Sequence, residues 1–326
     1  MTVIIMKIYL PNSAFLGNID PFLRSFDPTD PSVLEVTSNP RWISIHPVVI
    51  CMVAALGITV EPENIHIEKL EARSKHYLER MGLFSVLGMD SNIKIVEHEP
   101  AGRFIPLTIV KNSKEQSHVI ADMIPLLHLK PQKAEPIKYV ISELVRNVLE
   151  HSQSPRGAIL CAQFYEKSNT IRIGIVDTGI GIKRSISASH GVTTDMEAIR
   201  LALTPGITGT TNRIGGTEEN AGAGLFFIKS IACASRDFFM LYSGDAMFKL
   251  LKRGPSAKRI ILNTNPFDDR HSTDPHLPYW QGTVVGIDIS LDQGQEFTSL
   301  LEILRTVYSR AVSEQKKMKF KKPKFI

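Results

Sequence analysis

The sequence predicts an α/β fold in two parts, each of them a sheet with helices packed on it. Short runs rich in β-branched residues alternate with amphipathic helical segments, which is typical of sheets covered by helices. A length of 326 residues corresponds to about two domains. Hydrophobic residues make up 43% of the chain and charged residues 22%, as in a globular protein with a sizeable core.

The first part, residues 1–112, is expected to form the smaller α/β domain. Gly57 closes an apolar segment that is typical of a buried helix. The polar stretch at residues 111–118 follows the last strand, and we place the domain boundary there. The expected strands are residues 2–10, 33–38, 64–70 and 103–110, and the expected helices are residues 46–57 and 74–84.

The second part, residues 113–312, opens with a helix at residues 136–151, whose apolar residues recur at helical spacing. A turn at residues 167–169 joins the two strands that come next. In chain order we expect strands at 157–165 and 170–177, a glycine-rich connection, a helix at 195–203, a segment rich in Gly and Thr at 204–222, a helix at 224–235, strands at 237–244, 247–254, 258–264 and 282–291, and a helix at 296–315.

The net charge of +5 belongs to the C-terminal tail, residues 313–326, which holds six lysines and one glutamate. The rest of the chain is near neutral, so the charge does not indicate a basic binding face. A solvated, mobile end is the favoured interpretation of the tail. Contact with nucleic acid or an anionic membrane, through this tail alone, is the alternative.

Three features favour a cytoplasmic protein without a transmembrane segment. Cys51, Cys161 and Cys233 lie far apart, with neither metal spacing nor a disulfide pattern, which indicates a reducing compartment. The longest apolar run, residues 47–60, is too short to span a bilayer. The N-terminus lacks the layout of a signal peptide.

A polar row on the helix at residues 136–151 is the first candidate for a site. Glu143, Asn147 and His151 recur every four residues, and such a step drifts only about 40° around a helix. The row therefore follows one border of the apolar face, where it either lines a cleft or forms a solvated edge. Arg146 projects to another side and is expected on the surface.

Two glycine motifs further along the chain favour the cleft. Asp177 ends a strand just before Gly179 and Gly181, so a carboxylate that can accept a hydrogen bond from an exocyclic amine lies beside backbone that a flat ring can approach. Gly222 and Gly224 precede a helix, whose free N–H groups and dipole favour phosphate. There is neither a G-x-x-x-x-G-K-[ST] motif nor a G-x-G-x-x-G motif after a strand, which argues against P-loop and Rossmann sites.

Together these motifs resemble the GHKL, or Bergerat-fold, ATP-binding superfamily, which includes DNA gyrase, the heat-shock chaperone ATPases, MutL and histidine kinases. The resemblance covers about residues 113–310 and implies an α/β sandwich with a mixed sheet and helices on one face. The matching segments are residues 143–151 for the N box, 177–182 and 222–225 for the two glycine boxes, and Gly282 and Thr283 for the closing strand.

The resemblance implies ATP and Mg²⁺ as cofactors. Asn147 would bind Mg²⁺ through its amide oxygen, and Glu143 would orient and deprotonate an attacking water or hydroxyl. Asp177 would recognise the adenine amine. For His151, a cleft-wall or capping role and a ligand contact both remain open.

The other site residues implied by the resemblance are mostly glycines. Gly179 and Gly181 would make room for the adenine, and Gly222 and Gly224 would bring the phosphates to the helix start. Thr283 would contact the nucleotide from the closing strand. The segment at residues 204–222 would be a flexible lid.

Residues 34–57 and 74–84 more weakly resemble STAS domains, the anti-sigma-factor-antagonist fold. Antagonists of that kind carry a phosphorylatable Ser or Thr at the start of their central helix. Here His46 and Pro47 stand near that place and Ser44 is out of register, so a scaffold or partner-binding role is favoured. There is no preceding dimerisation helix with a phospho-acceptor histidine, which argues against an orthodox sensor histidine kinase.

Three functions are therefore open. The first is a regulatory ATPase or switch whose lid closes on ATP to control a protein partner, itself a candidate STAS-like protein. The second is a protein serine kinase that resembles anti-sigma factors. The third is a module that keeps ATP as a structural ligand only, and the presence of both Glu143 and Asn147 argues against it. A second copy of the chain is a further candidate partner.

Overall fold

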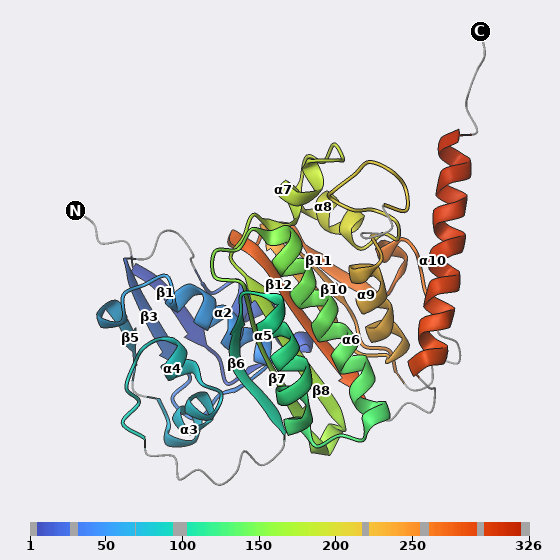
Figure 1. Ribbon diagram of the computed structural model, residues 1–326. Coiled ribbons are helices and arrows are strands. Elements are labelled where there is room, and N and C mark those ends of the chain that lie inside the picture. Colours follow the sequence, from blue (N-terminus) through green and yellow to red (C-terminus); the bar gives the residue numbers. More distant parts are fainter. Residues whose placement is uncertain are drawn as a thin grey trace.

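The computed structural model is a mixed α/β protein, which confirms the fold class expected from the sequence. A seven-stranded sheet lies in the middle, with helices on one side and most of the N-terminal region on the other (Figure 1). The structure describes residues 5–26, 32–68, 70–93, 103–216, 222–254, 261–291 and 297–320. Within these ranges no helix is long and apolar enough to cross a bilayer.

All neighbouring strands of the large sheet run antiparallel, so the expected mixed sheet is wrong here. The short β7–β8 and β9–β10 connections can join only antiparallel strands, and β12 lies between β8 and β9 with its direction opposed to both. The order is β11-β10-β9-β12-β8-β7-β6. The strands are β6 (Phe104–Val110), β7 (Ala158–Tyr165), β8 (Thr170–Asp177), β9 (Phe239–Gly244), β10 (Ala246–Leu250), β11 (His271–Asp274) and β12 (Trp280–Ser290).

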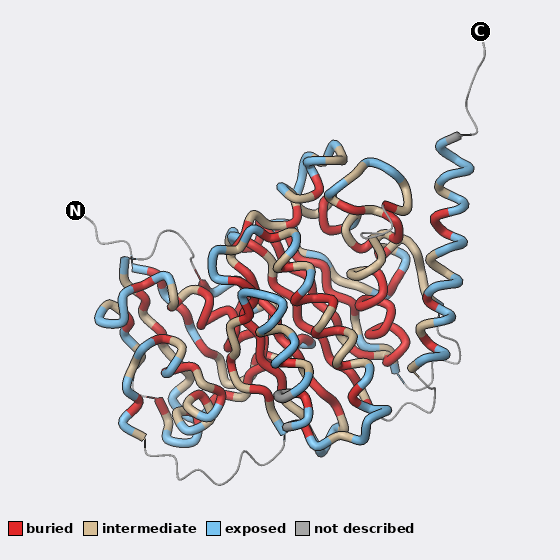
Figure 2. Tube along the Cα trace, viewed as in Figure 1, coloured by how far each residue is buried: buried red, intermediate tan, exposed pale blue. Residues whose placement is uncertain are grey.

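The two faces of the sheet belong to two hydrophobic clusters, because successive side chains of a strand point to opposite faces. Leu160 and Ala162 of β7 pack with the helices on one face, whereas Ile159 and Cys161 pack with the N-terminal region on the other. Figure 2 shows buried residues concentrated in the sheet and in the elements next to it. Helices were expected on one face only, yet both faces are covered.

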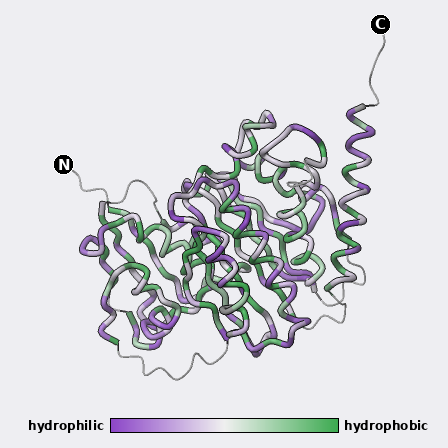
Figure 3. Tube along the Cα trace, in the orientation of Figure 1, coloured by the Kyte–Doolittle hydropathy of each residue, from purple (hydrophilic) through white to green (hydrophobic). Residues whose placement is uncertain are grey.

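Helices of the C-terminal region cover the first face. α6 and α9 pack on each other and on the sheet, and α10 packs against both. The outer end of α10 is hydrophilic (Figure 3). The helices are α5 (Ser113–His118), α6 (Pro131–Asn147), α7 (Gly181–Ser187), α8 (Asp195–Ala202), α9 (Gly224–Ala234) and α10 (Phe297–Phe320).

Helix α2 (Pro47–Gly57), which is apolar almost throughout, covers the second face. Its first turn lies over Gly174 of β8 and Gly286 of β12, which are directly opposite each other in the register. A Cβ atom on Gly174 would overlap the backbone of Val48, so the absence of a side chain there lets the helix reach the sheet.

The N-terminal region adds a small parallel sheet in the order β1-β3-β5. The helix expected at residues 74–84 is broken at Gly82, whose φ of 80° is left-handed. The remaining elements are the strands β1 (Ile5–Leu10), β2 (Ser13–Ala14), β3 (Val33–Ser38), β4 (Ser44–Ile45) and β5 (Ile65–Ile67), and the helices α1 (Asp20–Leu23), α3 (Ala72–Arg80) and α4 (Leu83–Val86).

The boundary expected near residue 112 follows β6 directly. That strand pairs with β7, so the large sheet contains one strand from the first region. The polar residues that were expected as a linker form α5, because the Asn112 side chain accepts a hydrogen bond from the backbone N–H of Glu115 and caps the helix.

Three further differences concern glycine-rich and C-terminal segments. The connection after Asp177 contains α7, which the sequence did not indicate. The last helix continues to Phe320, so the first residues of the expected tail are helical, and residues 321–326 lie outside the described residues. Of the strand expected at 258–264, residues 258–260 are not described and residues 261–264 are not a strand.

The contact between α2 and the sheet generates a stability prediction. Gly174→Ala places a Cβ atom against the backbone of α2 and should lower the free energy of unfolding by roughly 1–3 kcal/mol, as overpacking does. Gly191→Ala is the matched control, because a Cβ atom there meets nothing within 4 Å. Urea unfolding of both variants measures the difference. Equal effects at the two positions would contradict the packing.

Candidate functional site

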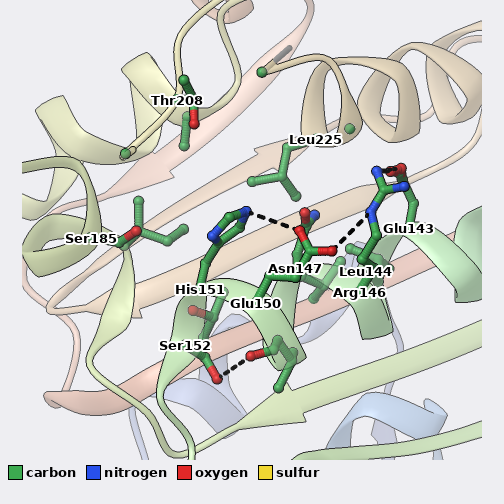
Figure 4. A pocket seen from close by; sticks show the side chains of 18 of the residues that line it. Glu143, Leu144, Arg146, Asn147, Glu150, His151, Ser152, Ser185, Thr208 and Leu225 are labelled. Carbon is green, nitrogen blue, oxygen red and sulfur yellow. Dashed lines mark hydrogen bonds and ion pairs between the residues drawn. The ribbon is translucent and has the colours of Figure 1, made fainter. Parts of the chain in front are cut away.

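One cleft of about 400 Å³ lies between α6, the sheet, α7 and the start of α9. Its floor is formed by the ends of β8 and β12, and its walls come from α6, α7 and the loop before α9. Figure 4 shows polar side chains of α6 along one wall. The residues that line it are Tyr139, Glu143, Leu144, Arg146, Asn147, Val148, Glu150, His151, Ser152, Ile175, Asp177, Gly181, Ile182, Ser185, Ile186, Ala202, Ile207, Thr208, Gly209, Gly222, Ala223, Gly224, Leu225, Thr283 and Val285.

The polar row of α6 lines this cleft, which decides between the two interpretations of the row. Glu143 is 7% exposed, and Asn147 and His151 are half-buried. The α-helix ends at Asn147 and continues as a π-helical turn, Val148–Ser152, which carries His151 on the same wall. Burial raises the pKa of Glu143, although Arg146 opposes this, and burial lowers the pKa of His151.

Arg146 does not project away from the site as the sequence led us to expect. Its Nη2 donates to both carboxylate oxygens of Glu143, at 2.8 Å to Oε2. Its Nε lies 4.0 Å from Oε1 of Glu150, whose Oε2 lies 3.7 Å from Nε2 of His151. The reason is the three-residue spacing, which puts Arg146 one turn above Glu143 on the same side of the helix. The four side chains form a polar row along the cleft (Figure 4).

At the floor of the cleft, Asp177 ends β8 and is only 2% exposed. Its Oδ1 accepts a hydrogen bond of 2.8 Å from the backbone N–H of Gly179, and its register partner on β12 is Thr283. Burial raises the pKa of Asp177 to about 6, although hydrogen bonds from Gly179 and Thr283 lower it. The carboxylate is therefore mostly ionised near pH 7 and can accept a further hydrogen bond.

The turn after β8 is packed tightly against the end of α6. The N–H of Ile180 donates to the carbonyl of Ser152 at 2.7 Å. A Cβ atom on Gly179 would overlap that carbonyl, so a larger residue would push the turn away from α6. Gly181 lines the cleft, whereas Gly179 lies beneath its surface.

The start of α9 points its backbone at the polar row of α6. Ala223 is the N-cap residue and provides no side-chain cap, so the first turn of α9 is not capped by its N-cap side chain. A Cβ atom on Gly224 would lie 3.3 Å from Cγ of Glu143 and 3.5 Å from Nδ2 of Asn147. This short approach brings the backbone at the start of α9 next to a carboxylate and an amide.

Part of the expected lid also borders the cleft. Residues 204–216 and Gly222 are described, whereas residues 217–221 lie outside the described residues. Two backbone hydrogen bonds close the loop, from the N–H of Gly206 to the carbonyl of Gly222 and from the N–H of Gly215 to the carbonyl of Gly206. A Cβ atom on Gly206 or Gly215 would press against Val312 of α10, so the loop packs on that helix.

Every site residue named from the sequence except Gly179 therefore lines one cleft, and Gly179 supports it from below. Tyr139 was missed, although it stands four residues before Glu143 and so extends the same row. Ser185 was missed because α7 itself was not indicated by the sequence, and Thr208 was covered only by the expected lid segment and not as a single residue.

Comparison with known proteins finds no match for this chain, either among protein-family models or among curated proteins. Within the described residues there is no group of three or more His, Cys, Asp and Glu that could hold a metal ion.

The raised pKa of Asp177 predicts a pH dependence. Its folded-state pKa of about 6 lies above the usual 3.8, so its contribution to stability is present at low pH and is lost as the pH rises through 6. Asp177→Asn should abolish this loss. Between pH 5 and pH 8, the free energy of unfolding of the variant should rise relative to wild type by about 1 kcal/mol. A pH-independent difference in chemical denaturation would contradict the buried carboxylate.

Proposed function

We propose that the cleft binds Mg²⁺ and ATP and that the chain is a regulatory ATPase of the GHKL kind, which controls a protein partner. The observation that carries this proposal is the convergence of Glu143, Asn147, Asp177 and Gly224 on one cleft. These residues come from three elements that are distant in the sequence. Their chemistry suits a nucleotide, with a carboxylate at the floor and free backbone N–H groups at the opposite helix.

The adenine end of the site is assigned to Asp177, Gly181 and Thr283. Asp177 is a buried acceptor, so it favours a base with an amine over one with a carbonyl at that position. The apolar side chains of Ile175, Ile182, Ile186 and Val285 flank it and suit a flat ring.

The phosphate end is assigned to Asn147, Glu143 and the start of α9 at Gly224. Bound Mg²⁺ would offset the charge of the phosphates there, with the Asn147 amide oxygen as its protein ligand. Glu143 would accept the proton of the attacking water or hydroxyl, since the neutral amide of Asn147 cannot act as a base. The raised pKa of Glu143 suits that role.

We also infer that residues 113–312 form a Bergerat-type domain with β6 as an added edge strand, and that the N-terminal region is STAS-like. The parallel β1-β3-β5 sheet and the central helix α2 support the second inference. His46 caps α2 by accepting a hydrogen bond from the N–H of Val48, and its Nε2 lies 3.0 Å from Oδ1 of Asp288 on β12. This buried contact ties the helix to the ATP-binding sheet and favours a scaffold role over phosphorylation.

Calorimetry with ATP and GTP tests the binding proposal. Wild type should bind ATP in the presence of Mg²⁺ and prefer it to GTP by roughly ten-fold or more, since an unpaired buried carboxylate costs about 1–3 kcal/mol. Asn147→Ala should abolish the Mg²⁺-dependent part of the affinity while leaving the circular dichroism spectrum unchanged. Equal affinity for both nucleotides would count against the role of Asp177 in binding adenine. An Asn147→Ala variant with the same Mg²⁺-dependent affinity as wild type would count against the role of Asn147 in binding Mg²⁺.

Glu143→Gln tests the chemistry separately from binding. The variant keeps the shape of the side chain but removes its basicity, so turnover should fall by roughly 10²–10⁴ while ATP affinity stays within a few-fold. Incubation of wild type and variant with γ-labelled ATP, alone and with candidate partners, measures the turnover. Free phosphate would identify a hydrolase, and protein-bound label a serine kinase. A variant as active as wild type would exclude Glu143 as the base, and an inactive wild type would favour ATP as a structural ligand.

A further inference from the structure

Arg146 stands out among the residues that line the cleft. In the described part of the chain it is the one lysine or arginine of the lining, which also contains the carboxyl groups of Glu143, Glu150 and Asp177. Because acids outnumber bases in the lining, a bound polyanion is stabilised by Mg²⁺ and by any side-chain cation that lies near the phosphates. Arg146 is the side chain placed to supply that charge.

The surroundings of Arg146 allow it to move towards the phosphates. Its side chain is 54% exposed, whereas that of its partner Glu143 is only 8% exposed. The carboxylate is therefore buried in the wall of the cleft, whereas the arginine side chain is accessible to solvent. Arg146 also stands next to Asn147 and lies one turn beyond Glu143, against which the start of α9 packs at Gly224.

We infer that Arg146 recognises the terminal phosphate of the nucleotide and leaves Glu143 when it does so. The inference rests on the proposed function and adds a specificity-determining residue to it. A guanidinium forms paired hydrogen bonds with a carboxylate or a phosphate equally well, so one group can exchange the first partner for the second. The exchange releases the Glu143 carboxylate to accept a proton only when a third phosphate is present.

Two consequences follow from this exchange. A nucleoside diphosphate offers no phosphate at that position, so Arg146 stays on Glu143 and contributes nothing to its binding. A nucleoside triphosphate gains the contact, so the residue discriminates ATP from ADP. A lysine at position 146 would carry the same charge, but its ammonium group lacks the planar pair of N–H donors of a guanidinium. It should therefore restore only part of the affinity for ATP.

The test is calorimetry of Mg²⁺–ATP and Mg²⁺–ADP binding to wild type and to Arg146→Ala. ATP affinity should fall roughly 10- to 100-fold, and ADP affinity should change less than about three-fold. Arg146→Lys should recover part of the loss. Arg156→Ala is the matched control, because Arg156 is exposed and does not line the cleft.

Loss of ATP affinity in Arg146→Ala could also arise because Glu143 is no longer neutralised and repels the nucleotide. A second set of variants, which lacks the Glu143 carboxylate, separates this effect from a lost contact with phosphate. Repeating Arg146→Ala in a Glu143→Gln chain removes the carboxylate that the arginine could screen. Loss of ATP affinity that persists in this background supports the inference. Loss that disappears there, or that is equal for ATP and ADP, overturns it while the proposed function stands. A wild-type chain that binds neither nucleotide would overturn the proposed function and this inference with it.

Discussion

The candidate site depends on how closely the start of α9 approaches α6. A Cβ atom on Gly224 would lie 3.3 Å from Cγ of Glu143, tighter than most such contacts, so Glu143 would have to shift slightly to admit it. Glycine at this position lets the start of α9 lie close to a carboxylate and an amide without displacing them. A side chain at position 224 would push the start of α9 and these two groups of α6 apart, and so widen the proposed phosphate end of the cleft.

That arrangement is held in place from two directions. On the far face of the sheet, α2 lies on Gly174 and Gly286, so the N-terminal region supports the strands that form the floor of the cleft. On the near face, α10 holds the loop before α9: Lys319 donates to the carbonyl of Asn212, and Val312 packs under the loop. A partner that moved α2 or α10 would therefore change the cleft without entering it.

The sequence predicted the parts of the site that follow a local rule. Four-residue spacing identified Glu143, Asn147 and His151, and a strand end followed by glycines identified Asp177. The order of the strands could not be predicted, because β12 pairs with β8, about a hundred residues earlier in the chain, and with β9, about forty residues earlier. The apolar composition of α2 predicted burial, yet composition cannot indicate which sheet buries it. The contact of Arg146 with Glu143 follows from their three-residue spacing, which the prediction of a surface arginine on another side of the helix did not take into account.

Mapping of amide chemical shifts on addition of Mg²⁺ and a non-hydrolysable ATP analogue tests the central claim most directly. We predict saturable changes at Gly181 and Gly224, on opposite sides of the cleft, with the resonances of the β1-β3-β5 sheet largely unchanged. Changes confined to that small sheet, or no change at millimolar analogue, would contradict the claim that this cleft is a nucleotide site.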